Sequence, residues 1–158
     1  MQNPISSIME VDAYTCYESA TLEDVVKTLV ERQIGGLVII NDKEHVVGFI
    51  SDGDIMKAVA KQRTRAIYSG DSSMVFYDDE SLENKLRNFK MRNVMELATR
   101  NVICATPDRS IEEVARMLSK KKIKKIPIVN ENGMLVGIAR RSTILRYIFS
   151  LILEMDSL

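Results

Sequence analysis

Ser51 and Asp54 are the two side chains whose types and spacing give this sequence its clearest chemistry. They follow a short apolar run, Val46–Ile50, which is interrupted only by Gly48. A hydroxyl and a carboxylate three residues apart are typical of a capping box at a helix N-terminus. A helix start also presents free N–H groups and the positive end of the helix dipole, and both attract anions. The pair therefore has two interpretations, a helix cap and a ligand site.

A second chemically distinctive stretch, Lys120–Lys125, contains five lysines. Lys120–Lys122 fall at the expected end of a helix, where positive charge suits the dipole. Lys124 and Lys125 lead into an apolar stretch and are candidate phosphate ligands. Nucleic acid is another target of basic runs. However, the chain carries 22 basic and 22 acidic residues and no aromatic set for stacking on bases, so we expect no nucleic-acid binding.

No catalytic or metal centre is expected. His45 is the only histidine, and Cys16 and Cys104 show no metal or redox spacing. We interpret both thiols as reduced packing residues, which predicts a cytoplasmic protein. With one histidine and two unrelated cysteines, the sequence offers no nucleophile–base arrangement, so we expect that the protein is not an enzyme. No apolar stretch reaches the length needed to span a bilayer, and no signal peptide is recognised at 1–12, so we expect no membrane partner.

An internal repeat determines where these residues lie. A shift of 89 residues aligns 13–60 with 102–149 without a gap, with nine identities and agreement at most apolar positions. Each copy predicts a β-α-β-β-α unit, giving an α+β (mixed α/β) fold. The predicted division is a first repeat at 1–61, a connector at 62–92 with a short amphipathic helix at 81–91, and a second repeat at 93–158.

The repeat also predicts the individual elements. The opening strands are expected at Ala13–Tyr17 and Val102–Thr106, and helices should begin at Thr21 and Ser110. The hairpins and closing helices are expected at 37–40 with 46–50, 126–129 with 135–139, 53–61 and 142–155.

The connector raises two further expectations. Its polar, turn-rich stretch, Thr64–Ser73, is expected to be a loop with its flexible point at Ser69–Ser73. Its aromatic residues, Tyr68, Phe76 and Tyr77, suggest either packing of the connector or a lid near a ligand.

Several stretches of the sequence resemble the motifs of a known family. Val46-Val-Gly-Phe-Ile-Ser-Asp-Gly-Asp-Ile55, Ile123–Val129, Leu135–Ile138 and Val102–Pro107 are similar to motifs of tandem CBS domains (a Bateman module). The resemblance covers about 9–61 and 95–150. It implies a pseudo-two-fold pair of repeats that binds adenine-containing ligands between them without catalysis. Occupancy would be passed to a regulated partner that the sequence does not identify.

The resemblance also implies residue roles. Ser51 and Asp54 would hold the ribose and proximal phosphate, with Asp54 on the sugar hydroxyls, since a carboxylate accepts strong hydrogen bonds from vicinal hydroxyls and repels phosphate. The base would contact the opening strand of the second repeat, and the lysine pair would meet the phosphates. The implied ligand-binding set is Phe49, Ser51, Asp54, Val102, Ile103, Lys124 and Lys125.

The second repeat departs from this pattern, because Arg140 and Thr143 stand where the first has Ser51 and Asp54. A second site formed by Tyr14, Arg140 and Thr143 is therefore expected to be weak or empty, with Arg140 and Arg141 alternatively serving phosphates across the cleft.

The predicted ligand is AMP, ADP or ATP. S-adenosylmethionine and NAD are alternatives of the same shape, and a scaffold protein with vestigial sites is the alternative of another class. The last helix, Ile144–Met155, carries more apolar residues than one core needs, which predicts a homodimer.

Overall fold

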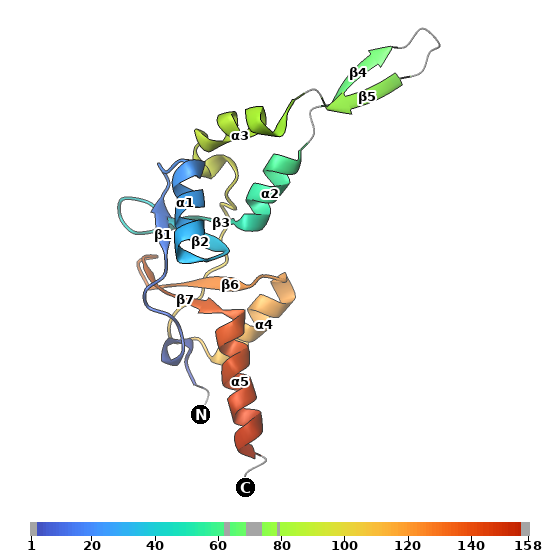
Figure 1. The fold of residues 1–158 in the computed structure, drawn as a ribbon. Coiled ribbons are helices and arrows are strands. Elements are labelled where there is room, and N and C mark those ends of the chain that lie inside the picture. Colours follow the sequence, from blue (N-terminus) through green and yellow to red (C-terminus); the bar gives the residue numbers. More distant parts are fainter. Residues whose placement is uncertain (1–2, 62–63, 69–73, 79, 156–158) are drawn as a thin grey trace.

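The structure is a computed structural model that describes residues 3–61, 64–68, 74–78 and 80–155, without the side chains of 64–68 and 74–78. The two repeats form the two halves of the molecule, and the elements of the second, with α5, lie at the opposite end from α1 and α3 (Figure 1). The mixed α/β architecture predicted from the repeat is confirmed.

The first repeat has all five predicted elements. It contains β1 (Thr15–Tyr17), α1 (Leu22–Arg32), β2 (Gly36–Ile40), β3 (Val46–Ser51) and α2 (Asp52–Ala60). The sheet order is β1-β2-β3, with β1 parallel to β2 and β3 antiparallel to it. The parallel pair requires a crossover, which α1 supplies. Every residue of the central strand β2 is buried, which explains its uninterrupted apolar sequence.

The second repeat differs from the prediction at its first strand. Helix α4 (Ile111–Lys121), strands β6 (Lys125–Val129) and β7 (Leu135–Arg140) and helix α5 (Arg141–Met155) are present. The strand expected at Val102–Thr106 is reduced to a single bridge between Ala105 and Ile128. In the first repeat, the Glu18 N–H extends the pairing by donating to Ile40 O at 3.0 Å. Pro107 stands at the equivalent position and has no N–H to donate, so pairing stops.

Each repeat is completed by the segment that precedes the other. Ile5, in the 3₁₀ turn η1 (Ile5–Ser7), is fully buried in the second core, and Val94, in η2 (Val94–Glu96), is fully buried in the first. Figure 1 shows the N-terminal segment beside the second repeat. The first core comprises Leu22, Val25, Leu37, Ile39, Ile50, Phe89 and Val94. The second comprises Ile5, Ala105, Ile111, Val114, Leu118, Ile126, Ile128, Ala139 and Ile144.

The connector contains more regular structure than its composition predicts. The loop prediction is wrong for Thr64–Tyr68, which is strand β4 and pairs antiparallel with β5 (Met74–Asp78). Residues rich in β-branched and aromatic types on both sides of a turn-forming stretch favour a hairpin over a loop. The flexible point predicted at 69–73 lies outside the described residues, as do the side chains of Tyr68, Phe76 and Tyr77.

The amphipathic helix predicted in the connector is confirmed as α3 (Leu82–Lys90), capped by Ser81. Only part of its apolar face is covered, since Phe89 is 8% exposed and joins the first core whereas Leu82 is 61% exposed.

The two cysteines lie in half-buried positions and form no disulfide. Burial raises the pKa of Cys16 to about 11 and also raises the pKa of Cys104. Both therefore remain thiols near neutral pH, which suits packing residues rather than nucleophiles. Among the helices of the described residues, none combines the length and apolar character needed to cross a bilayer.

Candidate functional site

A cavity of about 670 Å³ lies between the two repeats. Its wall on the first repeat is the turn from β3 into α2, and its wall on the second comes from the start of β6 and the turn from β7 into α5. The segment between η2 and α4 supplies a further wall through residues that include Val102 and Ile103. Thus, the cavity is formed by elements far apart in sequence and related by the 89-residue shift.

All seven residues of the implied ligand-binding set line this cavity: Phe49, Ser51, Asp54, Val102, Ile103, Lys124 and Lys125. Asp52, Thr99, Lys122 and Arg141 also line it and were not in that set. For Arg141, the sequence suggests only an alternative role as a phosphate ligand across the cleft. The sequence could have indicated Asp52 and Lys122 by their position, because Asp52 follows Ser51 and Lys122 lies two residues before Lys124.

Ser51 and Asp54 form a complete capping box at the start of α2. The Asp54 N–H donates to Ser51 Oγ at 3.3 Å, and the Ser51 N–H and hydroxyl both donate to Asp54 Oδ2 at 2.8 Å. No described residue donates to Oδ1 of Asp54. The cap therefore uses one carboxylate oxygen and leaves the other for a ligand hydroxyl, so the two interpretations of the pair are compatible.

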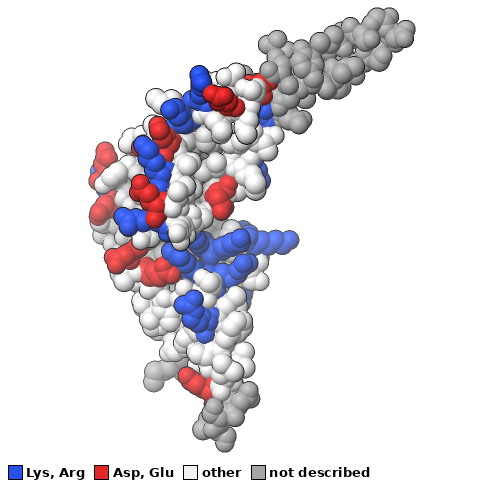
Figure 2. Space-filling view, viewed as in Figure 1, with Lys and Arg blue, Asp and Glu red and all other residues white. Residues whose placement is uncertain are grey.

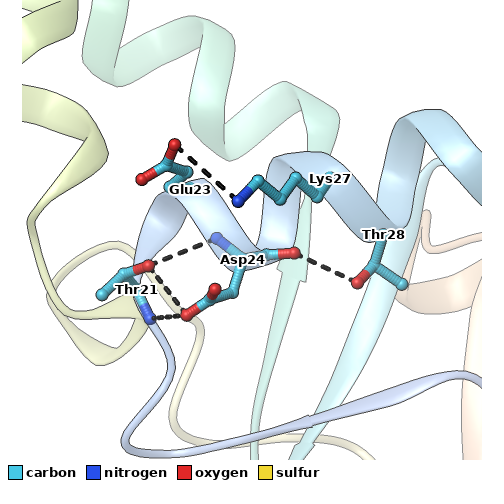
Figure 3. Close-up of polar contacts among 5 residues, drawn as sticks. All are labelled: Thr21, Glu23, Asp24, Lys27 and Thr28. Carbon is cyan, nitrogen blue, oxygen red and sulfur yellow. Dashed lines mark hydrogen bonds and ion pairs between the residues drawn. The ribbon is translucent and has the colours of Figure 1, made fainter.

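The same capping box occurs twice more in the described residues, away from the cavity. Thr21 with Asp24 caps α1 and Ser110 with Glu113 caps α4. Figure 3 shows the Thr21–Asp24 box, in which the Thr21 N–H and hydroxyl donate to Asp24 Oδ2 at 3.0 and 2.8 Å. Helix capping by such pairs is thus a repeated feature of this fold. Ser51 and Asp54 differ from the other two pairs because they line the cavity.

Positive charge gathers at the middle of the molecule, where Figure 2 shows Lys and Arg side chains clustered over a hollowed face between the two halves. The cavity-lining cations are Lys122, Lys124, Lys125, Arg140 and Arg141, against the two carboxylates Asp52 and Asp54. A concave surface with this excess of positive charge favours anionic ligands.

Two of these cations are incompletely satisfied within the protein. Burial and then repulsion from Arg140 lower the pKa of Lys125, while Asp52 and Glu10 act in the opposite direction. Arg140 Nε is buried and has no hydrogen-bond partner among the described residues. An anion bound beside Lys125 would favour its charged form and offset the cost of its burial.

The residues proposed for a second, weaker site do not all meet. Arg140 lines the cavity described above, but Tyr14 and Thr143 do not. The Arg32 guanidinium lies 5.2 Å from the centre of the Tyr14 ring. The Thr143 hydroxyl donates to Glu10 Oε1 at 3.3 Å. Arg140 is therefore better described as part of the principal cavity.

Glu10 is a residue that sequence reasoning missed. Its carboxylate pairs with Arg140, with 3.1 Å between Oε2 and Nη2, and accepts from Thr143. Glu10 lies 89 residues before Thr99, so extending the repeat a few residues toward the N-terminus would have related it to a cavity-lining position. No group of three or more potential metal ligands occurs in the part of the chain that the structure describes.

The fold and the cavity define a pair of CBS domains. The family model "CBS domain" matches residues 5–61 and 94–150, and the chain belongs to this family. The family assignment predicted from the motifs is thereby confirmed. Pairs of CBS domains are in general regulatory modules rather than catalytic ones.

Several known proteins are similar to most of this chain. Uncharacterized protein MJ1426 of Methanocaldococcus jannaschii is 29% identical over 138 residues, which cover 82% of both chains. A homoserine O-acetyltransferase of Methanosalsum zhilinae is 28% identical over 134 residues. The chain spans 22% of that enzyme and 40% of the M. jannaschii protein MJ1225, so these matches concern only part of those proteins.

Solved structures share the whole fold. The CBS domain pair of protein MJ0100, in complex with 5′-methylthioadenosine and S-adenosyl-L-methionine, has a TM-score of 0.72 at 25% identity and covers 95% of this chain and 98% of that one. CBSX2 of Arabidopsis thaliana in complex with AMP has a TM-score of 0.71 at 22% identity, covering 94% and 97%. Both solved proteins thus hold adenosine-containing ligands.

Proposed function

We propose that this protein is a regulatory module that binds an adenine nucleotide, AMP, ADP or ATP, in the cavity between its two CBS repeats. The observation that carries the proposal is the meeting of Ser51 and Asp54 with Val102, Ile103 and the lysine pair in one cavity. Asp54 Oδ1 would accept a hydrogen bond from a ribose hydroxyl, and the cations would hold the phosphates. Val102 and Ile103 would contact the base. The AMP bound to CBSX2, which has the same fold, supports an adenine nucleotide as the ligand class.

The regulatory consequence follows from the position of the cavity. A ligand that contacts both repeats stabilises those relative orientations in which all its contacts form, and it shifts the population by its difference in affinity between states. The regulated partner would bind differently to the different relative orientations of the two repeats. We also propose a cytoplasmic location, where cysteines that form no disulfide stay reduced.

S-adenosylmethionine is a second candidate, because the MJ0100 domain pair binds it. Its sulfonium is positive, whereas the cavity of this chain is lined by five cations and two carboxylates. We therefore expect phosphate-bearing ligands to bind more tightly.

A thermal-shift panel of AMP, ADP, ATP, guanine nucleotides, NAD and S-adenosylmethionine tests this proposal. A ligand at 100 times its Kd stabilises the folded state by about 2.7 kcal/mol, which raises Tm by several degrees. We expect the adenine nucleotides to give the largest shifts. A panel in which no ligand moves Tm would contradict nucleotide binding and favour the scaffold alternative.

We also propose that two copies associate through α5. Apolar side chains cover much of this helix, and Phe149, Ile152 and Leu153 are 55%, 52% and 69% exposed. Exposed apolar surface of this extent is typical of an interface. We expect light scattering to give the mass of a dimer at micromolar concentration, and Phe149→Glu to shift the mass toward the monomer. A monomeric wild-type protein would contradict this proposal.

A further inference from the structure

The carboxylate of Glu10, which does not line the cavity, forms an ion pair with Arg140. The two groups are 3.1 Å apart, and their side chains are 38% and 29% exposed, so the pair is partly shielded from water. Thr143 holds the other oxygen of Glu10 at 3.3 Å. Arg140 lines the cavity, so the residue that pairs with Glu10 also belongs to the proposed ligand site.

Arg140 has unused capacity for an anion. Its Nε is buried without a partner among the described residues, although a guanidinium can donate five hydrogen bonds. A phosphate in the cavity would accept from this guanidinium and would place a second negative charge near Glu10. Because the two anions repel each other and share one cation, ligand binding weakens the pair between Glu10 and Arg140.

Glu10 also anchors the segment that leads from the second repeat into the first. Its N–H donates to Ile138 O at 2.9 Å, and the Ile138 N–H donates to Glu10 O at 2.8 Å. Just before it, Met9 packs so closely on Gly137 that an added Cβ there would lie 2.8 Å from Met9 Sδ. After Glu10 the chain crosses to β1, and Val11 is 71% exposed. Among the described residues, the Glu10–Ile138 pair is therefore the last backbone hydrogen bonding of this segment to the second repeat before the crossing.

We propose that Glu10 is an internal anion that competes with the ligand's phosphate for Arg140, and that its displacement loosens the crossing segment at 8–14. This inference rests on the proposed nucleotide site. It adds a way in which ligand binding changes the crossing segment at 8–14 between the repeats. Coupling of this kind is reciprocal: if the ligand weakens the Glu10 contact, removing the contact strengthens ligand binding by the same factor.

Calorimetric titration of ATP into wild type, Glu10→Gln and Glu10→Thr tests the inference, with Glu112→Gln as the matched control. Glu112 pairs with Arg116 at 2.9 Å on the exposed surface of α4, away from the cavity. Glu10→Thr introduces the residue type found at the equivalent position, Thr99. We expect both Glu10 variants to bind ATP about two- to five-fold more tightly than wild type, and Glu112→Gln to bind as wild type does.

Hydrogen exchange supplies the second measurement. In wild type, saturating ATP should speed amide exchange in a peptide covering 8–14, and in Glu10→Gln that peptide should already exchange fast without ATP. Unchanged or weaker ATP binding by both Glu10 variants, or slower exchange at 8–14 on binding, would overturn the inference while leaving the nucleotide site intact. If wild type binds no ATP at all, both the proposed function and this inference fail.

Discussion

Asp54→Ala is expected to abolish the stabilisation of this protein by adenine nucleotides. Asp54 presents Oδ1, the oxygen of its carboxylate that the α2 cap leaves unused, at the cavity, and we assign this oxygen to the ribose hydroxyls. At a ligand concentration that stabilises wild type by about 2.7 kcal/mol, the variant should show no resolved shift of Tm. Without ligand, it should lose about 1 kcal/mol of stability, because the cap is removed as well.

Asp24→Ala separates these two effects. Asp24 forms the same box with Thr21 at the start of α1, with contacts of 3.0 and 2.8 Å, but does not line the cavity (Figure 3). This variant should lose a cap yet keep the full nucleotide-induced shift. Equal ligand-induced shifts in the two variants would mean that Asp54 is only a cap.

Lys125→Ala is expected to weaken ATP binding by about ten-fold or more, with little effect on adenosine. A hydrogen bond to a charged group contributes about 1.5–3 kcal/mol, and Lys125 is half-buried at the cavity wall. Burial and the neighbouring Arg140 lower the pKa of Lys125, so a bound phosphate would also relieve a cost already present in the free protein. Calorimetric titrations with adenosine, AMP and ATP measure the difference.

Lys120→Ala is the control for this prediction. Lys120 belongs to the same lysine run, but it is exposed in the last turn of α4 and does not line the cavity. Its removal should leave ATP affinity within about two-fold, as expected for an exposed charge. If Lys125→Ala weakened adenosine and ATP equally, the lysine would be shaping the cavity rather than holding phosphate.

Local sequence signals predicted most of the elements correctly. Capping pairs placed the starts of α1, α2 and α4, since a cap depends only on residues three apart. Apolar runs placed the hairpins because their side chains fill the two cores. The predictions are wrong at Val102–Thr106, where Pro107 removes an N–H donor, and at Thr64–Tyr68, which is a strand of a hairpin and not part of a loop.

The sequence by itself determined the repeat, the family and the residues of the first motif. Only the tertiary structure decided that Arg140 joins the cavity of Ser51 and Asp54, and that Glu10 holds it from the other side. The physical reason is that periodicity and capping act over a few residues. The cavity and the Glu10 contact instead depend on how two complete repeats pack against each other, and on the preceding segments that cross between them.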